Sequence, residues 1–364
     1  MPVPVRRVLL VSARMGAGHQ GAATELARRL RARGHTAVVV DFLDAFPRPL
    51  AVLWERFYRS QLRYAPESYE SSYQLFYRHP RLWEPFVSFE RSLAGRRVTS
   101  WVAAERPDVV VSTYSFATLV LGRLRQEGSL PVPVVNFLTD FGVHPRAVHP
   151  FIDLNLALHD VPARAATDLA PTPTVVAGPA VRPDFEPDPA RRAAARKWLG
   201  IADDDRLVVV AAGSWGVGGD LAQTVGAIVR SGRFRVVTLC GSDQRLRRRL
   251  QRQGLGLALG WTDRMPELLA AADVVVENAG GLTSLEAFAS GVPIVTYRPI
   301  PGHGRDNTKG MVTAGVTQNP RDHAELIGAI DRLSRPGPER DSQVCRGAAL
   351  FCGEPIDHIL ARVS

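Results

Sequence analysis

A histidine inside a glycine-rich loop is the first group in this sequence that could do chemistry. The loop Gly16-Ala-Gly-His-Gln-Gly21 follows a short apolar run and precedes an amphipathic stretch, so we expect it to join a strand to a helix. Gly16 and Gly18 would let the backbone approach a ligand closely. The imidazole of His19 could then take a proton from a hydroxyl group as a general base. The alternative is a histidine that only caps the helix or packs against it.

The same loop also has the spacing of a dinucleotide-binding fingerprint. Asp41 lies 20 residues after Gly21, where the acidic residue of that fingerprint would bind a ribose. Two features disfavour this interpretation. Three residues separate the apolar run from Gly16, whereas the fingerprint turns at once, and a histidine occupies the interior of the loop. Dinucleotide binding is therefore the weaker alternative.

Two further glycine-rich loops lie in the second half of the chain, and both suit an anion. One is Asn278-Ala-Gly-Gly-Leu-Thr-Ser-Leu-Glu286 and the other is Gly213-Ser-Trp-Gly-Val-Gly-Gly219. Each follows an apolar run and precedes a helical stretch, so each offers backbone N–H groups and a helix N-terminus to a phosphate. Together they predict a diphosphate cradle, and Glu286 could accept hydrogen bonds from a ribose diol. A simple turn is the alternative for either loop alone.

The elements that must position these groups alternate between strand and helix. The expected strands are 8–12, 37–41, 107–112, 132–137, 153–157, 174–177, 207–211, 236–240, 257–259, 274–277 and 294–297. The expected helices are 22–33, 115–125, 191–199, 222–230, 244–253, 265–271, 282–290 and 324–333. A proline-rich joint at 178–189 separates two such series. The pattern predicts two doubly wound α/β domains that face each other across a cleft, with ligands at the carboxyl ends of the strands.

Aromatic and basic residues are concentrated between residues 46 and 101. This segment has helical character and holds 13 of the 27 aromatic residues, with five of the seven tyrosines among them. Arginines are interleaved with them, including Arg56, Arg59, Arg63, Arg78, Arg81 and Arg91. Such a mixture suits a membrane interface or an acceptor groove. A stacking platform for nucleic acid needs the same residue types, and an inserted helical subdomain with an aromatic core is the third interpretation.

The composition excludes several classes of protein. With 45% hydrophobic and 22% charged residues, the 364-residue chain is globular and long enough for two domains. No apolar run is long enough to span a bilayer. The three cysteines Cys240, Cys345 and Cys352 form no paired framework, so we expect a reduced, cytoplasmic compartment. Most of the net charge of +9 comes from the first half, which suits an anionic membrane surface.

Three other clusters are interpreted without a ligand. Asp203-Asp-Asp205 has the pattern of a metal-holding motif, but it lies in an expected turn before a strand, far from the ligand end. The histidines His144, His149 and His159 lack the tight spacing of a metal site. The basic stretch 244–253 is interpreted as a solvated helix face rather than as a nucleic-acid site. We therefore expect no metal and no nucleic-acid partner.

Six segments resemble the inverting glycosyltransferases of family 28, over nearly the whole length of the chain. They are Gly16-Ala-Gly-His19, Asn136-Phe-Leu-Thr-Asp-Phe-Gly-Val-His144, Gly178-Pro-Ala-Val-Arg182, Gly260-Trp-Thr-Asp-Arg-Met265, residues 279–286, and Pro299-Ile-Pro-Gly-His-Gly-Arg-Asp-Asn307. The family includes the monogalactosyl- and processive glucosyl-diacylglycerol synthases and, more distantly, the MurG transferase of peptidoglycan synthesis. The resemblance implies the GT-B fold, in which two Rossmann-like domains face each other across a cleft.

The implied domains are an acceptor-binding domain at 1–182, with the aromatic-rich insert 46–101, and a UDP-sugar-binding domain at 183–345. The last segment, 346–364, is expected to hold a helix that crosses back to the first domain. Where the family commonly has Gly-Gln-Glu, this chain has Gly302-His303-Gly304, and this difference bears on the identity of the donor sugar.

The resemblance also implies roles for single residues. His19 matches the proposed base and Asp140 a family aspartate near the acceptor, where Gly16, Gly18 and His144 also lie. Donor-side positions are Gly213 and Ser214 in the first loop, Met265 near the base, Gly280, Gly281 and Thr283 at the phosphates, Glu286 at the ribose, and His303 and Asn307 in the segment near the sugar. Neither cofactor nor metal is expected, because helix N-termini and loop amides would meet the negative charge on departing UDP.

The function that follows from this resemblance is the transfer of a hexose from a UDP-sugar to a lipid acceptor such as diacylglycerol. The enzyme would be cytoplasmic and peripheral on the inner face of the cell membrane. Three alternatives stay open at this point. They are a transferase acting on a soluble natural-product acceptor, a sugar-nucleotide epimerase, and a non-catalytic relative that binds membranes.

Overall fold

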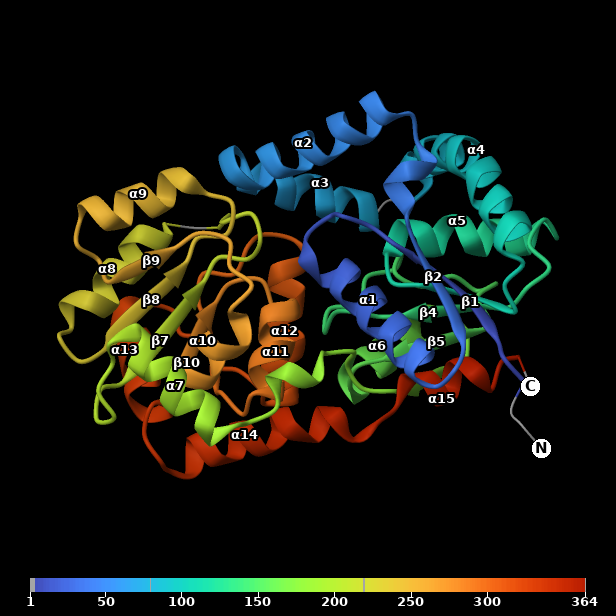
Figure 1. Cartoon of the computed structure of the whole chain (residues 1–364). Helices are drawn as coiled ribbons and strands as arrows, with labels where there is room; N and C mark the ends of the chain where they lie inside the picture. The colour runs from blue at the N-terminus through green and yellow to red at the C-terminus, as the bar shows by residue number, and fades with distance from the viewer. Residues whose placement is uncertain (1–3, 79, 219, 364) are drawn as a thin grey trace. The chain divides into compact units, whose positions relative to one another are not determined.

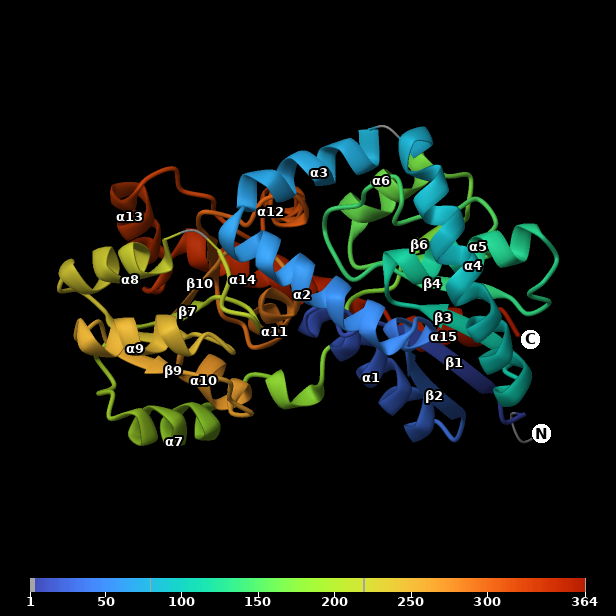
Figure 2. The ribbon, with the colours of Figure 1, turned by 90° about the horizontal axis from the view of Figure 1, so that it is seen from above.

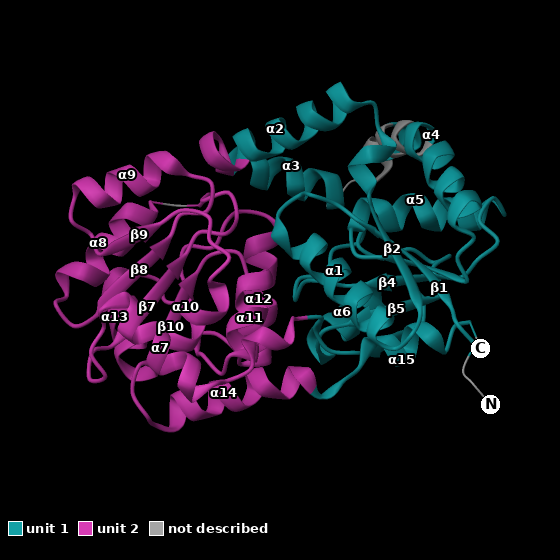
Figure 3. Cartoon of the chain, viewed as in Figure 1, with its two compact units in different colours: residues 1–61, 67–180, 352–364 teal, residues 62–66, 181–351 magenta. Residues whose placement is uncertain are grey.

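The computed structural model describes residues 4–78, 80–218 and 220–363 (Figure 1). The chain divides into two compact units (Figure 3). The first unit comprises Met1–Gln61, Glu67–Ala180 and Cys352–Ser364, and the second comprises Leu62–Pro66 and Val181–Phe351. The main boundary, between Ala180 and Val181, falls inside the proline-rich segment 178–189.

The first unit is built on a six-stranded parallel sheet. Its strands are β1 (Arg7–Ser12), β2 (Thr36–Asp41), β3 (Val109–Ser112), β4 (Val134–Phe137), β5 (Leu154–Ala157) and β6 (Thr174–Val176). They lie in the order β2-β1-β3-β4-β5-β6, so the direction of winding reverses between β1 and β3. The loops that leave the carboxyl ends of strands at such a switch point diverge and leave room for a ligand.

Helices connect these strands or follow them. They are α1 (Ala17–Ala32), α2 (Arg48–Tyr64), α3 (Pro66–Arg78), α4 (Pro80–Glu105), α5 (Ser115–Gln126), α6 (Asp160–Leu169) and α15 (Pro355–Leu360), with a short 3-10 turn, η1, at Phe42–Ala45. Val98 of α4 and Val120 of α5 pack on Leu9 and Val11 of β1 in one apolar core. Among the described residues, no helix combines the length and the apolar character that a membrane span requires.

The aromatic-rich segment 46–101 is helical and forms α2, α3 and α4. The side chains of residues 78–83, 86, 87 and 89–91 lie outside the described part of the chain, and those of Arg78, Arg81 and Arg91 are among them. The described aromatic residues range from buried to exposed, and five of them are partly exposed. Phe46, Tyr69 and Tyr73 are buried, whereas Phe57 and Tyr64 of α2 are 64% and 70% exposed. The segment therefore supplies a core and also an outward apolar face.

The second unit has a five-stranded parallel sheet. Its strands are β7 (Leu207–Ala211), β8 (Arg235–Leu239), β9 (Leu257–Leu259), β10 (Val274–Glu277) and β11 (Ile294–Thr296), in the order β11-β10-β7-β8-β9. Its helices are α7 (Pro189–Leu199), α8 (Leu221–Arg230), α9 (Gln244–Arg252), α10 (Met265–Ala271), α11 (Leu282–Ala289), α12 (His303–Ala314), α13 (His323–Leu333) and α14 (Pro338–Ala349). Figure 2 shows α7 and α10 on one side of this sheet and α8 and α13 on the other. The switch point lies between β7 and β10.

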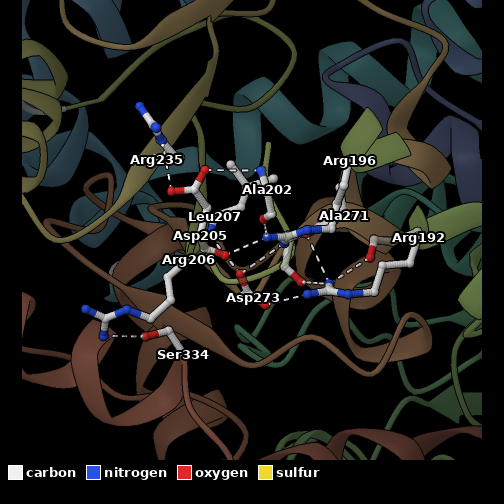
Figure 4. Close-up of polar contacts among 12 residues, drawn as sticks. Arg192, Arg196, Ala202, Asp205, Arg206, Leu207, Arg235, Ala271, Asp273 and Ser334 are labelled. Carbon is white, nitrogen blue, oxygen red and sulfur yellow. Dashed lines mark hydrogen bonds and ion pairs between the residues drawn. The ribbon is translucent and has the colours of Figure 1, made fainter. Parts of the chain in front are cut away.

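Arg192, Arg196 and Asp273 form a polar network that holds α7 against the end of the sheet at which β7 begins (Figure 4). Arg192 Nη2 lies 2.6 Å from Asp273 Oδ1, and the backbone N–H of Leu207 donates to Asp273 Oδ2 at 2.7 Å. Arg196, which is buried, donates to the carbonyl of Ala271 at 3.1 Å. Because this end of the sheet is held by fixed ion pairs, the loops at its opposite, carboxyl end are left for ligand binding.

The structure has every strand that the sequence predicts, with ends that differ by no more than two residues. Helices α6, α12 and α14 are not among the predicted ranges, because Pro162, the glycines at 302 and 304, and the Pro-Gly-Pro run at 336–338 suggest loops. The segment 203–205 lies in the turn between α7 and β7, where Asp205 accepts a hydrogen bond from the backbone of Ala202 and pairs with Arg235 at 3.1 Å. Among the described residues, no group of three His, Cys, Asp or Glu side chains is placed to hold a metal ion.

Candidate active site

His19 lies at the switch point of the first sheet, in the first turn of α1. Its Nδ1 atom is 2.7 Å from the carbonyl oxygen of Thr113, in the loop that follows β3. A carbonyl oxygen can only accept, so Nδ1 carries the proton of the neutral ring. In that tautomer Nε2 has a free lone pair. The geometry therefore makes Nε2 the atom of His19 that can receive a proton.

The loops after β1, β3 and β4 all contribute to the position of this ring. Thr113 Oγ1 donates to the carbonyl of His19 at 3.1 Å. Thr139 Oγ1 lies 3.1 Å from His19 Nδ1 and donates to Asp140 Oδ2 at 3.1 Å. Tyr114 packs edge-on against the imidazole, with 5.1 Å between the ring centroids. The hydroxyl of Thr139 therefore links Asp140 to His19, an arrangement that suits a positioning group.

Space in front of the histidine comes from the two glycines. Gly16 is the N-cap of α1 with a φ of 96°, which a residue with a side chain rarely adopts. A Cβ atom at Gly18 would meet nothing within 4 Å, so the loop is open at this point. Asp41 is used elsewhere: its Oδ1 accepts from the N–H of Leu43 and its Oδ2 from that of Arg14. The dinucleotide alternative therefore lacks its ribose ligand.

A row of aromatic rings runs from α2 through α3 to His144. Tyr58 and Tyr69 pack edge-on at 5.5 Å between centroids, and Tyr77 stacks on His144 at 4.0 Å. Tyr73 lies between Tyr69 and Tyr77 in the sequence, and its ring centroid is 4.4 Å from that of Tyr77. Burial first, and then the charge of Asp140, raise the pKa of Tyr58 to about 12. His144, where the row ends, belongs to the same loop after β4 as Asp140.

In the second unit, the two predicted anion loops meet at the switch point. The side-chain amide of Asn278, just after β10, donates to the carbonyl of Val217 in the loop after β7 at 3.2 Å. Close packing explains the glycine at Gly218, where a Cβ atom would overlap Nδ2 of Asn278. The two loops are thus one structure, as expected of a cradle for a diphosphate.

Glu277 is a residue of this site that sequence reasoning missed. It is 4% exposed at the end of β10, and its Oε2 accepts hydrogen bonds from the N–H groups of Ala279 at 2.7 Å and Gly280 at 2.6 Å. Its Oε1 accepts from the hydroxyl of Thr296 at 2.5 Å. The available signal was a carboxylate that ends an otherwise apolar strand directly before a Gly-Gly pair.

These bonds revise the predicted role of Gly280, whose N–H is used by Glu277 and is not open to a phosphate. Gly280 determines the shape of the loop instead, because its φ is 66° and a Cβ atom there would lie only 2.7 Å from Asn307 Cβ. The partly exposed residues Gly281 and Thr283 lie at the start of α11. The first N–H groups of a helix have no partner within it, so this start can receive an anion.

Glu286 lies in α11 and is 8% exposed. Burial raises the pKa of its carboxyl to about 8, and the nearby positive charge of Arg182 only partly opposes this shift. The side chain is therefore largely protonated at neutral pH. A group of this kind, a carboxyl kept neutral in an enclosed place, is typical of functional sites.

The other predicted donor residues lie around the same loops. Asn307 of α12 is 1% exposed, and its Nδ2 donates to the carbonyl of Ala279 at 3.1 Å, so it supports the loop from below. His303 is the first residue of α12 and is partly exposed. Met265 begins α10 and is also partly exposed. As contacts to a donor, these positions stay predictions.

Gly213 and Ser214 open the loop after β7, and the carbonyl of Ser214 accepts from the N–H of Ser242 at 3.0 Å. Gly304 packs tightly against Ile300, because a Cβ atom at this glycine would overlap Cγ1 of that residue. The glycine in place of the family's larger residue is therefore matched by its surroundings in this chain.

Comparisons with known proteins find a glycosyltransferase family match in each of the two units. Residues 19–179 match the family model of monogalactosyldiacylglycerol (MGDG) synthase, and residues 218–335 match that of glycosyl transferases group 1. The processive diacylglycerol beta-glucosyltransferase of Bacillus pumilus is 23% identical over 337 residues, which are 90% of this chain and 86% of that protein. The protein of the same name from Bacillus mycoides is 24% identical over 363 residues, covering 97% and 92%.

Solved structures share the fold. MurG of Acinetobacter baumannii matches with a TM-score of 0.61 at 14% identity, over 98% of this chain and all of that chain. HepE of Anabaena, solved with UDP-glucose, matches with a TM-score of 0.57 at 15% identity, over 98% of both chains. The predicted GT-B fold and the resemblance to glycosyltransferases of family 28 are thus confirmed.

Proposed function

The chain is a hexosyltransferase, and from this premise we propose that it moves a hexose from a UDP-sugar to a lipid acceptor such as diacylglycerol, with inversion at the anomeric carbon. The observation that carries the proposal is the contact between His19 Nδ1 and the carbonyl of Thr113. It sets the tautomer that a base needs, at the switch point where the fold places ligands. The two Bacillus relatives support the lipid acceptor by their names.

On the acceptor side, His19 Nε2 takes the proton of the attacking hydroxyl as the new bond to the sugar forms. The chain Thr139–Asp140 holds the ring and stabilises the imidazolium that results, because a carboxylate lies one hydroxyl away. Attack on the face opposite the leaving group inverts the configuration. A positioned base of this kind contributes about 10²–10⁴ to the rate.

On the donor side, the cradle of the two glycine loops holds the diphosphate of UDP. The start of α11 faces the negative charge that develops as the sugar leaves, and the hydroxyl of Ser284 beside it is buried with no partner among the described residues. Glu286 holds the ribose hydroxyls. These dipoles replace a metal ion in our proposal, so the reaction needs no divalent cation.

The lipid acceptor reaches this site from a membrane surface on which the enzyme docks. The outward side of α2 suits such docking, because Leu53, Phe57 and Tyr64 recur at helical spacing and are 64%, 64% and 70% exposed. Arginines on the same helix, such as Arg56, match an anionic leaflet. We accordingly propose a peripheral enzyme on the cytoplasmic face of the cell membrane.

The test is to incubate the purified protein with a panel of UDP-sugars and a lipid extract. We expect release of UDP together with a lipid heavier by one hexose, whose anomeric configuration NMR shows to be inverted. If the hexose is transferred only to soluble natural products, the acceptor is a molecule of that class and not a lipid. A changed UDP-sugar without acceptor would identify an epimerase, and neither product with any donor would indicate a non-catalytic protein.

A further inference from the structure

The outer side of α9 in the second unit is the strongest feature that the proposed site does not use. Nine residues, Gln244–Arg252, contain five arginines and no acidic residue. The helix is anchored from inside, since Leu250 is fully buried in the core of this unit. We propose that the exposed arginines of α9, with Trp261 beside them, form a docking surface for an anionic lipid membrane. This inference rests on the proposed function, because docking on a membrane serves the reaction only if the acceptor is a lipid.

Most arginines of α9 have no acidic partner among the described residues, in contrast to several other arginines of the same unit. In the described part of the chain, Arg245, Arg248 and Arg252 have no carboxylate within ion-pair distance, and Arg249 approaches Asp220 only to 3.8 Å. By contrast, Arg192 and Arg206 lie 2.6 Å from Asp273 and Asp331. The high arginine content of the chain explains why α9 has many arginines, but it does not explain why most of them lack acidic partners.

Repulsion among these arginines destabilises helix α9. Arg245 and Arg249, and likewise Arg248 and Arg252, are four residues apart, a spacing at which like charges repel. Arg245 also lies in the first turn, near the positive end of the helix dipole. The cap partly compensates, since Asp243 Oδ1 accepts from the N–H groups of Arg245 and Leu246. A polyanionic surface would remove this repulsion, so the sequence is suited to a bound state.

The neighbouring apolar groups favour a membrane over a nucleic acid. Trp261 is 65% exposed and Leu257 is 43% exposed. Gly260, the residue before Trp261, lies beside the start of α9, because a Cβ atom there would lie 3.5 Å from Gln244 Nε2 and 3.6 Å from Arg247 Nη1. Tryptophan with basic residues suits the headgroup region of a bilayer. Single strands of nucleic acid bind to several stacking rings, and one exposed indole does not supply these.

The test measures binding of the full-length protein to vesicles in the absence of UDP-sugar and acceptor. The vesicles contain phosphatidylcholine alone or an equal mixture with phosphatidylglycerol. The triple variant Arg245→Gln, Arg248→Gln, Arg252→Gln should lose about a hundredfold in partitioning to the anionic vesicles, as each basic residue near the surface favours binding. The matched control is Arg235→Gln, Arg321→Gln, Arg335→Gln, which removes the same charge from paired positions of this unit. It should lose far less.

Equal loss in both triple variants would overturn the proposal, because it would show that net charge alone matters. So would unchanged binding of the α9 variant, or tighter binding of a single-stranded RNA than of the anionic vesicles. The α9 variant should keep its transfer rate on detergent-dispersed acceptor and unfold at no lower temperature than the wild type. Since vesicle binding needs no turnover, it can succeed where the proposed reaction fails, and the two failures are distinguishable.

Discussion

The Nδ1 atom of His19 and the carbonyl oxygen of Thr113 are 2.7 Å apart, although 94 residues separate them in the sequence. This bond determines which ring nitrogen carries the proton, and so which can receive one. It joins the start of α1 to the loop after β3, the two segments that flank the switch point of the first sheet. The fold thus selects both the place of the His19 ring and its tautomer.

Replacing His19 by alanine should lower kcat for hexose transfer by about 10²–10⁴, because the proton of the acceptor hydroxyl loses its acceptor. UDP affinity, measured by calorimetry, should stay near the wild-type value. His358→Ala, in α15 and away from the switch-point loops, serves as the control and should leave kcat unchanged. Turnover of His19→Ala within about threefold of wild type would exclude the histidine as the base.

Replacing Glu286 by alanine should weaken UDP binding by about tenfold or more, through loss of the proposed bonds to the ribose. Because the pKa of this buried carboxyl is about 8, binding of the diol to its ionised form should release protons below that pH. Calorimetry in buffers of different ionisation enthalpy measures this release. Equal affinity for wild type and Glu286→Ala would contradict the assigned role.

The free energy of unfolding should fall as the pH rises from 6.5 to 8 in the absence of ligand. Glu286 has a folded pKa of about 8, above its ordinary value of 4.5, so the unfolded chain loses this proton first and gains stability. The full contribution is present below pH 4.5 and is lost by pH 8. Between pH 6.5 and pH 8 the free energy of unfolding should fall by about 2 kcal/mol. Glu286→Gln should remove this decline. The same slope in both proteins would refute the shift.

The opposite slope is expected from His149 on the acidic side. Burial lowers the pKa of this histidine to about 4, so the unfolded chain binds the proton first as the pH falls from 6.5. Its ring packs so closely on Gly122 that a Cβ atom at this glycine would overlap the imidazole. Between pH 4.5 and 6.5 the resulting loss of stability opposes the gain toward acid expected from Glu286, so denaturant titrations should show His149→Asn gaining stability toward acid more steeply than the wild type. An unchanged acid slope in the variant would assign that slope to other groups.

Replacing Glu277 by leucine should destabilise the second unit and loosen the anion loop. The N–H groups of Ala279 and Gly280 would be left without their acceptor, at about 1–3 kcal/mol for each buried donor. UDP affinity should fall by about tenfold. Thr296→Val is the matched control, since it removes the third bond of the same carboxylate but keeps both loop bonds. If both variants bind UDP equally well, Glu277 has only a structural role.

The local pattern of the sequence determined the elements and most of the candidate site. Short runs of valine and leucine bury both faces of a parallel strand, so the strands could be placed from composition alone. The glycine loops stand directly after such strands, and this order alone puts His19 and Glu286 at the ligand-binding ends of the two sheets. Helix α12 was not foreseen, because its start, His303-Gly-Arg-Asp, has weak helix propensity and is held in place by packing against Ile300.

Only the tertiary structure decided which side chains are partners. Glu277 could have faced solvent or a ligand, and it is the chain fold that turns its carboxylate onto the N–H groups of Gly280 and its neighbour. For Asn307 the fold adds a partner that the sequence did not indicate, because its Nδ2 donates to the carbonyl of Ala279. The tautomer of His19 depends on an oxygen that belongs to another strand loop. Hydrogen bonds between distant residues depend on angstrom-scale packing, and sequence periodicity carries no information on that scale.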